Sequence, residues 1–203
     1  MTFLEAMQGR FACKLYKDKR ISEEDLLSIL EYGRLTPTSF GLEMWSFHVV
    51  ENQAMREQLY RACFEQTSVL SAPLSIITLS RPPSFLHPDG PYVKARGRRF
   101  PGELSLFVED YRPYYEFLAA EGRLESWSRS QGYLAVANMM TGAAELGIQS
   151  CAIEGFDEEM VLTLLGLKRE EWIVSMVIPF GYPGESERPK IRASLEELVV
   201  RYR

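Results

Sequence analysis

The stretch Trp127–Leu146, WSRSQGYLAVANMMTGAAEL, carries the clearest structural signal in the chain. Apolar and small residues fill most of it, including Leu134, Val136 and Met140, and Gly147 follows directly. A run of this kind that stops at a glycine is typical of an α-helix with a left-handed C-cap. Because apolar side chains surround most of its circumference, the pattern predicts a central helix buried in the core.

Apolar runs outside this helix predict a small sheet. Runs rich in β-branched and aromatic residues are typical of strands, and they occur at Trp45–Glu51, Leu74–Leu79 and Trp172–Pro179, with a short extended segment at Ile148–Ile153. Helical patterns outnumber these strands, and the two kinds do not alternate regularly. The expected fold class is therefore α+β rather than a doubly wound α/β sheet.

The other helices are indicated by their first turns and by their spacing. Ser22 and Asp157 each precede acidic residues and an apolar helical pattern, which is typical of N-caps. The spacing also predicts helices over residues 53–64 and 102–122, and Pro113 is expected to kink or split the second one.

A turn-rich basic stretch, Ser84–Pro101, predicts a long irregular loop. Its cations are Lys94, Arg96, Arg98 and Arg99. They suit the phosphates of a dinucleotide, and they suit a solvated loop at least as well. Residues 84–122 would then form a lid on an otherwise single domain that covers residues 1–203.

Composition excludes several classes of protein. The 203 residues are 46% hydrophobic, 25% charged and 12% aromatic, as in an ordinary globular chain with one large domain. The net charge of −5 argues against a general nucleic-acid binder. Two histidines and three widely spaced cysteines give no metal-site or disulfide pattern. With no signal peptide or membrane-length apolar run, a cytoplasmic protein without nucleic-acid or membrane partners is expected.

The common catalytic motifs are absent from the sequence. It contains no GxGxxG, no GxxxxGK[ST] and no GxSxG. His48 in a predicted strand, His87 in the loop and Cys13 beside Lys14 are each better explained as packed or solvent-exposed residues. We therefore expect a bound cofactor, rather than a side-chain nucleophile, to carry any chemistry.

Four short motifs occur in order along nearly the whole chain. They are Arg10-Phe11-Ala12-Cys13-Lys14, the loop Pro37–Trp45, the segment Ala152–Asp157, and the pair Lys190 and Arg192 after Pro189. Each alone also fits a plain structural role, such as a solvated basic face, a turn or a capped helix start. Together they resemble the R-x-S-x-[RK], P-S-S-x-N-x-Q-P-W, P-I-E-G-F-D and K-x-R motifs of the nitroreductase family, most closely its bacterial oxygen-insensitive NAD(P)H branch.

The resemblance implies a bound FMN, with NAD(P)H as co-substrate and no metal. Arg10, Lys190 and Arg192 would hold the FMN phosphate, and the backbone amides of Glu154 and Gly155 would face flavin N5 and O4. With Lys14, these amides would tune the flavin, and no side chain is assigned as a certain catalytic group. The other implied cofactor contacts are Phe11, Ala12, Thr38, Ser39, Gly41, Gln66, Ala152 and Ile153.

An activity and an assembly are implied as well. The family reduces nitroaromatics, quinones and similar electron-poor acceptors by ping-pong two-electron transfer. Phe40, Tyr111, Tyr114 and Tyr115 would line the acceptor pocket, although core or dimer packing explains these aromatic residues equally well. The family fold is a mainly antiparallel sheet flanked by helices, in an obligate-type homodimer with the C-terminal tail exchanged onto the partner. Alternatives are another acceptor (a pteridine, a flavin or a halogenated aromatic) and a non-catalytic flavin-binding protein.

Several positions depart from the family pattern. Ala12 replaces a serine, Gly41 an asparagine, Glu43 a glutamine, and Val69 a ring-contacting lysine found in some relatives. The first three leave the preferred acceptor open. Loss of the lysine charge predicts a lower FMN reduction potential than in relatives that have it.

Overall fold

A computed structural model describes residues 2–203, and within them it shows a single four-stranded antiparallel sheet. The strands are β1 (Trp45–Val50), β2 (Leu74–Ser80), β3 (Gln149–Ser150) and β4 (Ile173–Gly181), in the spatial order β1-β2-β4-β3. Every residue of the two central strands, β2 and β4, is buried, which explains their nearly continuous apolar sequences. The expected α+β class with a mainly antiparallel sheet is confirmed.

A β-bulge at Ser175 reverses the side-chain alternation of β4. Thr78 pairs with Met176 and Leu79 pairs with Val174, so Ser175 has no counterpart on β2. Val174 consequently packs in the core cluster on one face of the sheet, while Met176 packs in the cluster on the other.

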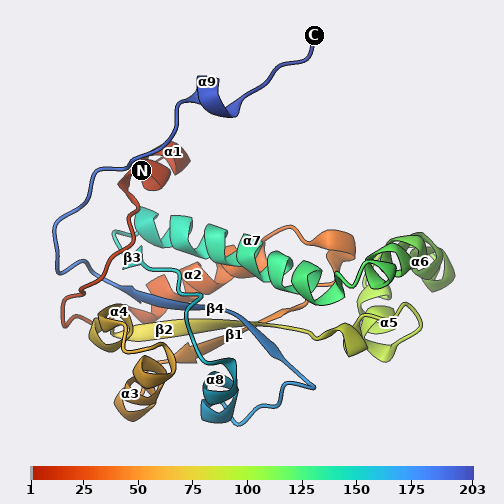
Figure 1. The fold of residues 1–203 in the computed structure, drawn as a ribbon, viewed down its shortest axis with the longest axis horizontal. Coiled ribbons are helices and arrows are strands. Elements are labelled where there is room, and N and C mark those ends of the chain that lie inside the picture. Colours follow the sequence, from red (N-terminus) through yellow and green to blue (C-terminus); the bar gives the residue numbers. More distant parts are fainter. Residues whose placement is uncertain (1) are drawn as a thin grey trace.

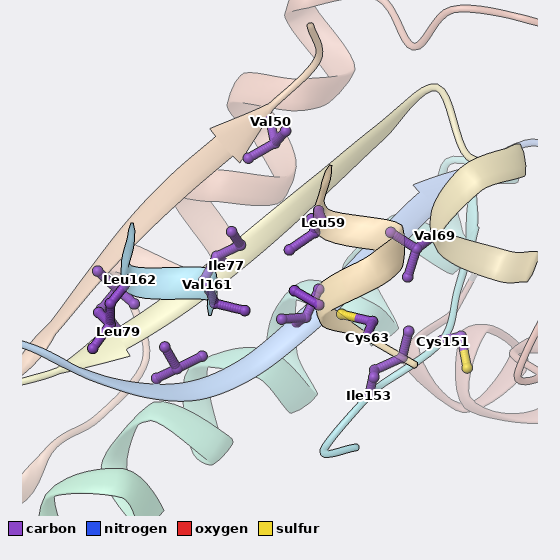
Figure 2. Close-up of a cluster of buried hydrophobic side chains, with 13 residues drawn as sticks. Val50, Leu59, Cys63, Val69, Ile77, Leu79, Cys151, Ile153, Val161 and Leu162 are labelled. Carbon is purple, nitrogen blue, oxygen red and sulfur yellow. The ribbon is translucent and has the colours of Figure 1, made fainter. Parts of the chain in front are cut away.

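Helices cover both faces of the sheet (Figure 1). On one face lie α2 (Glu23–Arg34) and α7 (Leu124–Glu145), and on the other lie α3 (Gln53–Ala62) and α8 (Glu158–Leu164). Figure 2 shows the apolar cluster between the sheet, α3 and α8. The remaining helical segments are α1 (Phe3–Gly9), α4 (Thr67–Ser71), α5 (Pro91–Gly97), α6 (Leu104–Ala120) and α9 (Leu195–Leu198), with 3₁₀ turns η1 (Ser39–Gly41) and η2 (Pro83–Phe85).

The central helix and its neighbours form where the sequence predicts them. Helix α7 begins three residues earlier than expected and buries Ala135, Met139 and Ala143 completely. Ser22 and Asp157 accept the expected N-cap hydrogen bonds from the third residues of α2 and α8. None of the described helices is both long and apolar enough to cross a lipid bilayer.

Two expectations about residues 84–122 are wrong in part. The stretch 84–101 is not irregular throughout, because η2 and α5 occupy much of it and Pro91 starts α5. A proline suits the first helical turn, where its missing N–H would have had no partner. Helix α6 runs unbroken through Pro113. That residue is exposed, so water can satisfy the carbonyl that the proline leaves free.

Gly142 allows α7 to approach α2 closely. A Cβ at this position would lie 2.1 Å from Cδ2 and 2.7 Å from Cγ of Tyr32, so the clash reaches the base of the ring. We expect Gly142→Ala to lower the free energy of unfolding by about 1–3 kcal/mol in a urea titration, although alanine favours helices over glycine. Gly9→Ala is the control, because a Cβ there meets nothing within 4 Å. Equal losses in the two variants would contradict the close approach.

Candidate functional site

The segment after α1 runs beside β3 and brings two of the sequence motifs together. Ala12 forms a parallel bridge with Ser150, and the backbone N–H of Phe11 donates to Oε1 of Gln149 at 3.0 Å. Farther along, Ile153 pairs with Val177 of β4. The stretches 10–14 and 152–155 therefore lie next to each other along the edge of the sheet.

Gln66 joins this arrangement from the start of α4. Its Nε2 donates to the backbone carbonyl of Gly155 at 3.1 Å. A Cβ added to Gly155 would meet no atom closer than 3.6 Å, so packing within the chain does not require a glycine there. The absence of a side chain leaves this backbone open to close approach by a ligand. Val69, one turn beyond Gln66, is fully buried in the core.

The C-terminal tail adds cations to the same place. Lys190 Nζ donates to the backbone carbonyl of Arg10 at 2.6 Å. Desolvation lowers the pKa of Lys190, and repulsion from Arg10 and Arg192 lowers it further, partly offset by Glu187. Desolvation also lowers the pKa of Arg10, followed by repulsion from Arg192. Three cations from opposite ends of the chain thus lie close enough to repel one another.

This donor set fits a phosphate monoester. Among the residues that the structure describes, no carboxylate lies within 4.0 Å of the charged nitrogens of Arg10, Lys190 or Arg192. A phosphate would offset their mutual repulsion, and guanidinium groups match its oxygens in bidentate geometry. Within residues 2–203, no group of His, Cys, Asp and Glu side chains is arranged to hold a metal ion.

The loop motif, residues 37–45, lies away from these groups and is held by helix α7. Thr38 Oγ1 and Ser39 N both donate to Oε1 of Gln131, at 3.3 and 2.9 Å. Two turns along the same helix face, Asn138 Nδ2 donates to Thr36 Oγ1 at 2.8 Å. Gln131 is only 6% exposed and was not among the predicted site residues. The available signal was a glutamine on the buried face of this helix.

The predicted acceptor aromatics gather beside this loop. The Phe40 ring centroid lies 5.1 Å from that of Tyr111 and 5.8 Å from that of Tyr114. Tyr111 is fully buried and its hydroxyl donates to the backbone carbonyl of Leu86 at 2.8 Å. Phe40, Tyr114 and Tyr115 keep exposed surface, so Tyr111 supports the cluster from beneath.

Helix α5 holds the other end of the loop. Arg96 and Arg99 pair with the Glu43 carboxylate at 2.9 and 2.6 Å. The Tyr92 hydroxyl donates to the backbone carbonyls of Leu42 and Glu43 at 2.8 and 2.9 Å. Two of the basic residues considered for a dinucleotide phosphate are therefore bound to a carboxylate. Glu43 stands where the family usually has glutamine. Its negative charge pairs with two arginines, and a neutral glutamine amide could not form these ion pairs.

Gly41 has a structural reason to differ from the family asparagine. Its φ is +59°, and a Cβ would lie 2.1 Å from Cζ of Phe100. Asparagine tolerates this φ, so the clash is the main obstacle. We expect Gly41→Asn to lower the melting temperature by a few degrees, as about 1 kcal/mol of overpacking would. The loss should disappear in a Phe100→Ala background in thermal denaturation. Equal losses in both backgrounds would contradict the clash.

Comparison with known proteins gives one family across the chain. The nitroreductase family profile matches residues 7–182. A Staphylococcus epidermidis protein with the provisional name NAD(P)H nitroreductase is 35% identical, over 98% of this chain and 96% of its own. A Bacillus subtilis protein with the provisional name NAD(P)H nitroreductase YfkO is 32% identical, over 97% of this chain and 95% of its own.

Solved structures show the same fold. A nitroreductase-like protein from Streptococcus mutans superimposes with a TM-score of 0.86 at 20% identity, covering 99% of this chain and 98% of that one. A protein from Exiguobacterium sibiricum with the provisional name nitroreductase, solved in complex with FMN, gives a TM-score of 0.79 at 19% identity and covers 100% of this chain and 98% of that one.

Proposed function

Because the chain belongs to the nitroreductase family of NAD(P)H-dependent oxidoreductases, we propose that it binds FMN and reduces nitroaromatic, quinone or similar electron-poor acceptors. The observation that carries this proposal is the gathering of Arg10, Lys190 and Arg192, three like charges that a phosphate would relieve. When bound, FMN would supply the redox chemistry, a two-electron transfer from NAD(P)H to the acceptor in ping-pong order.

The chain's own residues hold and polarise the cofactor in this proposal. The three cations bind the phosphate. The backbone amides of Glu154 and Gly155 donate to the polar edge of the flavin, where donors stabilise added negative charge. Gln66 offers its amide at the same place. The remaining neighbours in the motif segments complete the pocket: Phe11, Ala12, Lys14, Ala152 and Ile153.

We propose that the complete site needs two copies of the chain. Gln131 accepts hydrogen bonds from Thr38 and Ser39, while desolvation and then the nearby Glu154 carboxylate raise the pKa of Tyr133. The two residues are two positions apart and therefore about 200° around α7. The two groups of site residues thus face different sides of this helix within one chain. A partner in a homodimer would bring its loop, with Phe40 and Gly41, to the cofactor of the first.

The tail supports the same assembly. After β4 it runs past α1 and away from the sheet (Figure 1). Its apolar side chains are open to solvent, with Leu195 78%, Val200 73% and Tyr202 94% exposed. Such a surface is costly for a free chain and is removed when the tail is exchanged onto a partner. Sedimentation of the full chain should give a dimer at micromolar concentration, and a chain ending at residue 193 should dissociate.

The acceptor would meet the exposed parts of Phe40, Tyr114 and Tyr115, with Tyr111 packed behind them. Flat electron-poor rings stack favourably on such side chains. The departures at Ala12, Gly41 and Glu43 leave a pteridine, a flavin or a halogenated aromatic as alternative acceptors. Steady-state assays with nitrofurazone, a quinone and a dihydropteridine, each with NADH and NADPH, distinguish them.

The decisive experiment is the absorption spectrum of the purified protein before and after anaerobic NAD(P)H. We expect a flavin absorption spectrum, and we expect NAD(P)H to bleach it within the time of one catalytic turnover. A flavin spectrum that neither NADH nor NADPH bleaches would identify a non-catalytic flavin-binding protein. A protein that takes up no FMN would overturn the proposal.

A further inference from the structure

A lysine amine and a cysteine thiol are in contact at the proposed cofactor site. Lys14 Nζ lies 2.9 Å from Sγ of Cys151. Cys151 is 2% exposed whereas Lys14 is exposed, so the pair spans the boundary between core and solvent. Figure 2 shows Cys151 at the edge of the apolar cluster, with its sulfur directed away from the other side chains.

The charges around this sulfur set it apart from the other cysteines. Lys14 Nζ is in contact with the Cys151 sulfur. Cys151 also attracts Arg10, and this attraction opposes the lowering of the pKa of Arg10. Peroxides oxidise a cysteine sulfur to a sulfenic acid, and an amine already in contact with that sulfur is placed to attack it. Burial instead raises the pKa of Cys13, and it raises that of Cys63 to about 12. Both of these sulfurs are fully buried.

We propose that Lys14 and Cys151 form a reversible sulfenamide link when the protein without cofactor meets hydrogen peroxide or an organic hydroperoxide. The thiolate attacks the peroxide, the O–O bond breaks, and sulfur becomes a sulfenic acid while water or an alcohol leaves. The neutral Lys14 amine then attacks this sulfur, an S–N bond forms, and the sulfenic oxygen leaves as water with one amine proton. Thiol, amine and one hydrogen peroxide thus give the sulfenamide and two waters, and an organic hydroperoxide gives one alcohol and one water instead. A thiol reductant reverses the link.

The link would control occupancy of the site, a consequence that rests on the proposed function. A linked Lys14 loses its positive charge and its freedom to turn toward a flavin. Peroxide-treated protein should therefore take up less FMN, and bound FMN should protect the pair by engaging Lys14 first. Reduction with dithiothreitol should restore FMN uptake.

The test is peptide mass analysis of the full-length chain, treated with one equivalent of hydrogen peroxide with and without saturating FMN. Remaining thiols are blocked with an alkylating agent in acid before digestion with trypsin. We expect the peptides that contain Lys14 and Cys151 to be joined, lighter than their sum by about 2 Da and uncut after Lys14. Dithiothreitol should separate them, and FMN should reduce their yield several-fold.

Two variants make the assignment specific. Lys14→Arg keeps a positive charge but removes the primary amine, so the link should be lost. Cys13→Ser should keep it, which separates the sulfenamide from a Cys13–Cys151 disulfide, in which trypsin would still cut after Lys14. A link that survives Lys14→Arg, or that disappears in Cys13→Ser, would overturn the proposal. If the link forms as expected but FMN does not prevent it, the sulfenamide proposal stands and only the proposed contact of Lys14 with FMN is contradicted.

Discussion

Arg192→Ala should weaken FMN binding by about 10–100-fold, because a charge-assisted bond to a phosphate contributes about 1.5–3 kcal/mol. Arg192 repels both Arg10 and Lys190 in the free chain. Removing it therefore relieves repulsion before FMN binds and removes an attraction afterwards, and both effects favour the free state. Flavin fluorescence quenching in a titration of the protein stripped of flavin measures the dissociation constant.

Two comparisons make this result specific to the phosphate. Arg201→Ala removes the same charge from an exposed position of the same tail and should leave the affinity unchanged. Riboflavin lacks the phosphate, so Arg192→Ala should weaken its binding far less than that of FMN. Equal weakening for FMN and riboflavin would show that Arg192 acts through the fold of the tail rather than through the phosphate.

The elements that the sequence predicts are those with local causes. Helix α7 follows from a long run rich in apolar and small residues with a glycine stop, and the starts of α2 and α8 follow from N-caps three residues from their partners. Strands β2 and β4 follow from their burial on both faces. The error at 84–101 is also local, since a proline after a glycine marks a helix start as readily as a turn.

The unpredicted parts depend on partners far apart in the sequence. Gln131 bonds to a residue 92 positions away, and Glu43 pairs with arginines 53 and 56 positions away. No short sequence pattern predicts pairs this far apart. The sequence alone therefore did not show that Arg96 and Arg99 would balance the charge of Glu43. The cations at both ends of the chain are a third case, and there the family resemblance supplied the expectation that Arg10, Lys190 and Arg192 meet.

An ion-pair network joins α7, α8 and β4 beside the bulge. Arg129 Nη2 lies 2.9 Å from Glu158 Oε1 and 3.0 Å from Glu125 Oε1, and Arg129 Nη1 donates to the carbonyl of Val174. Glu158 Oε1 in turn accepts from Val174 N at 2.7 Å. These side chains therefore satisfy both backbone groups of a residue next to Ser175, where the β-ladder is interrupted.

Glu158→Ala should cost about 2–4 kcal/mol of unfolding free energy, because it takes one of two carboxylates from a half-buried guanidinium and leaves the backbone N–H of Val174 without its acceptor. The side chains of Arg129 and Glu158 are 23% and 22% exposed, so water replaces these bonds poorly. Glu159→Ala is the matched control: it lies in the same first turn of α8 but is exposed, so it reports the helix-dipole contribution alone.

A double-mutant cycle with Arg129→Ala isolates the pair, and a coupling energy above about 1 kcal/mol is expected. Urea titrations followed by circular dichroism give all four free energies. Coupling near zero, or equal losses for Glu158→Ala and Glu159→Ala, would show that the network is a surface feature. None of these residues belongs to the cluster of Arg10, Lys190 and Arg192. Glu158→Ala should therefore still bind FMN more tightly than riboflavin, whereas Arg192→Ala should lose that preference. The two variants thus separate the stability of the fold from the chemistry of the site.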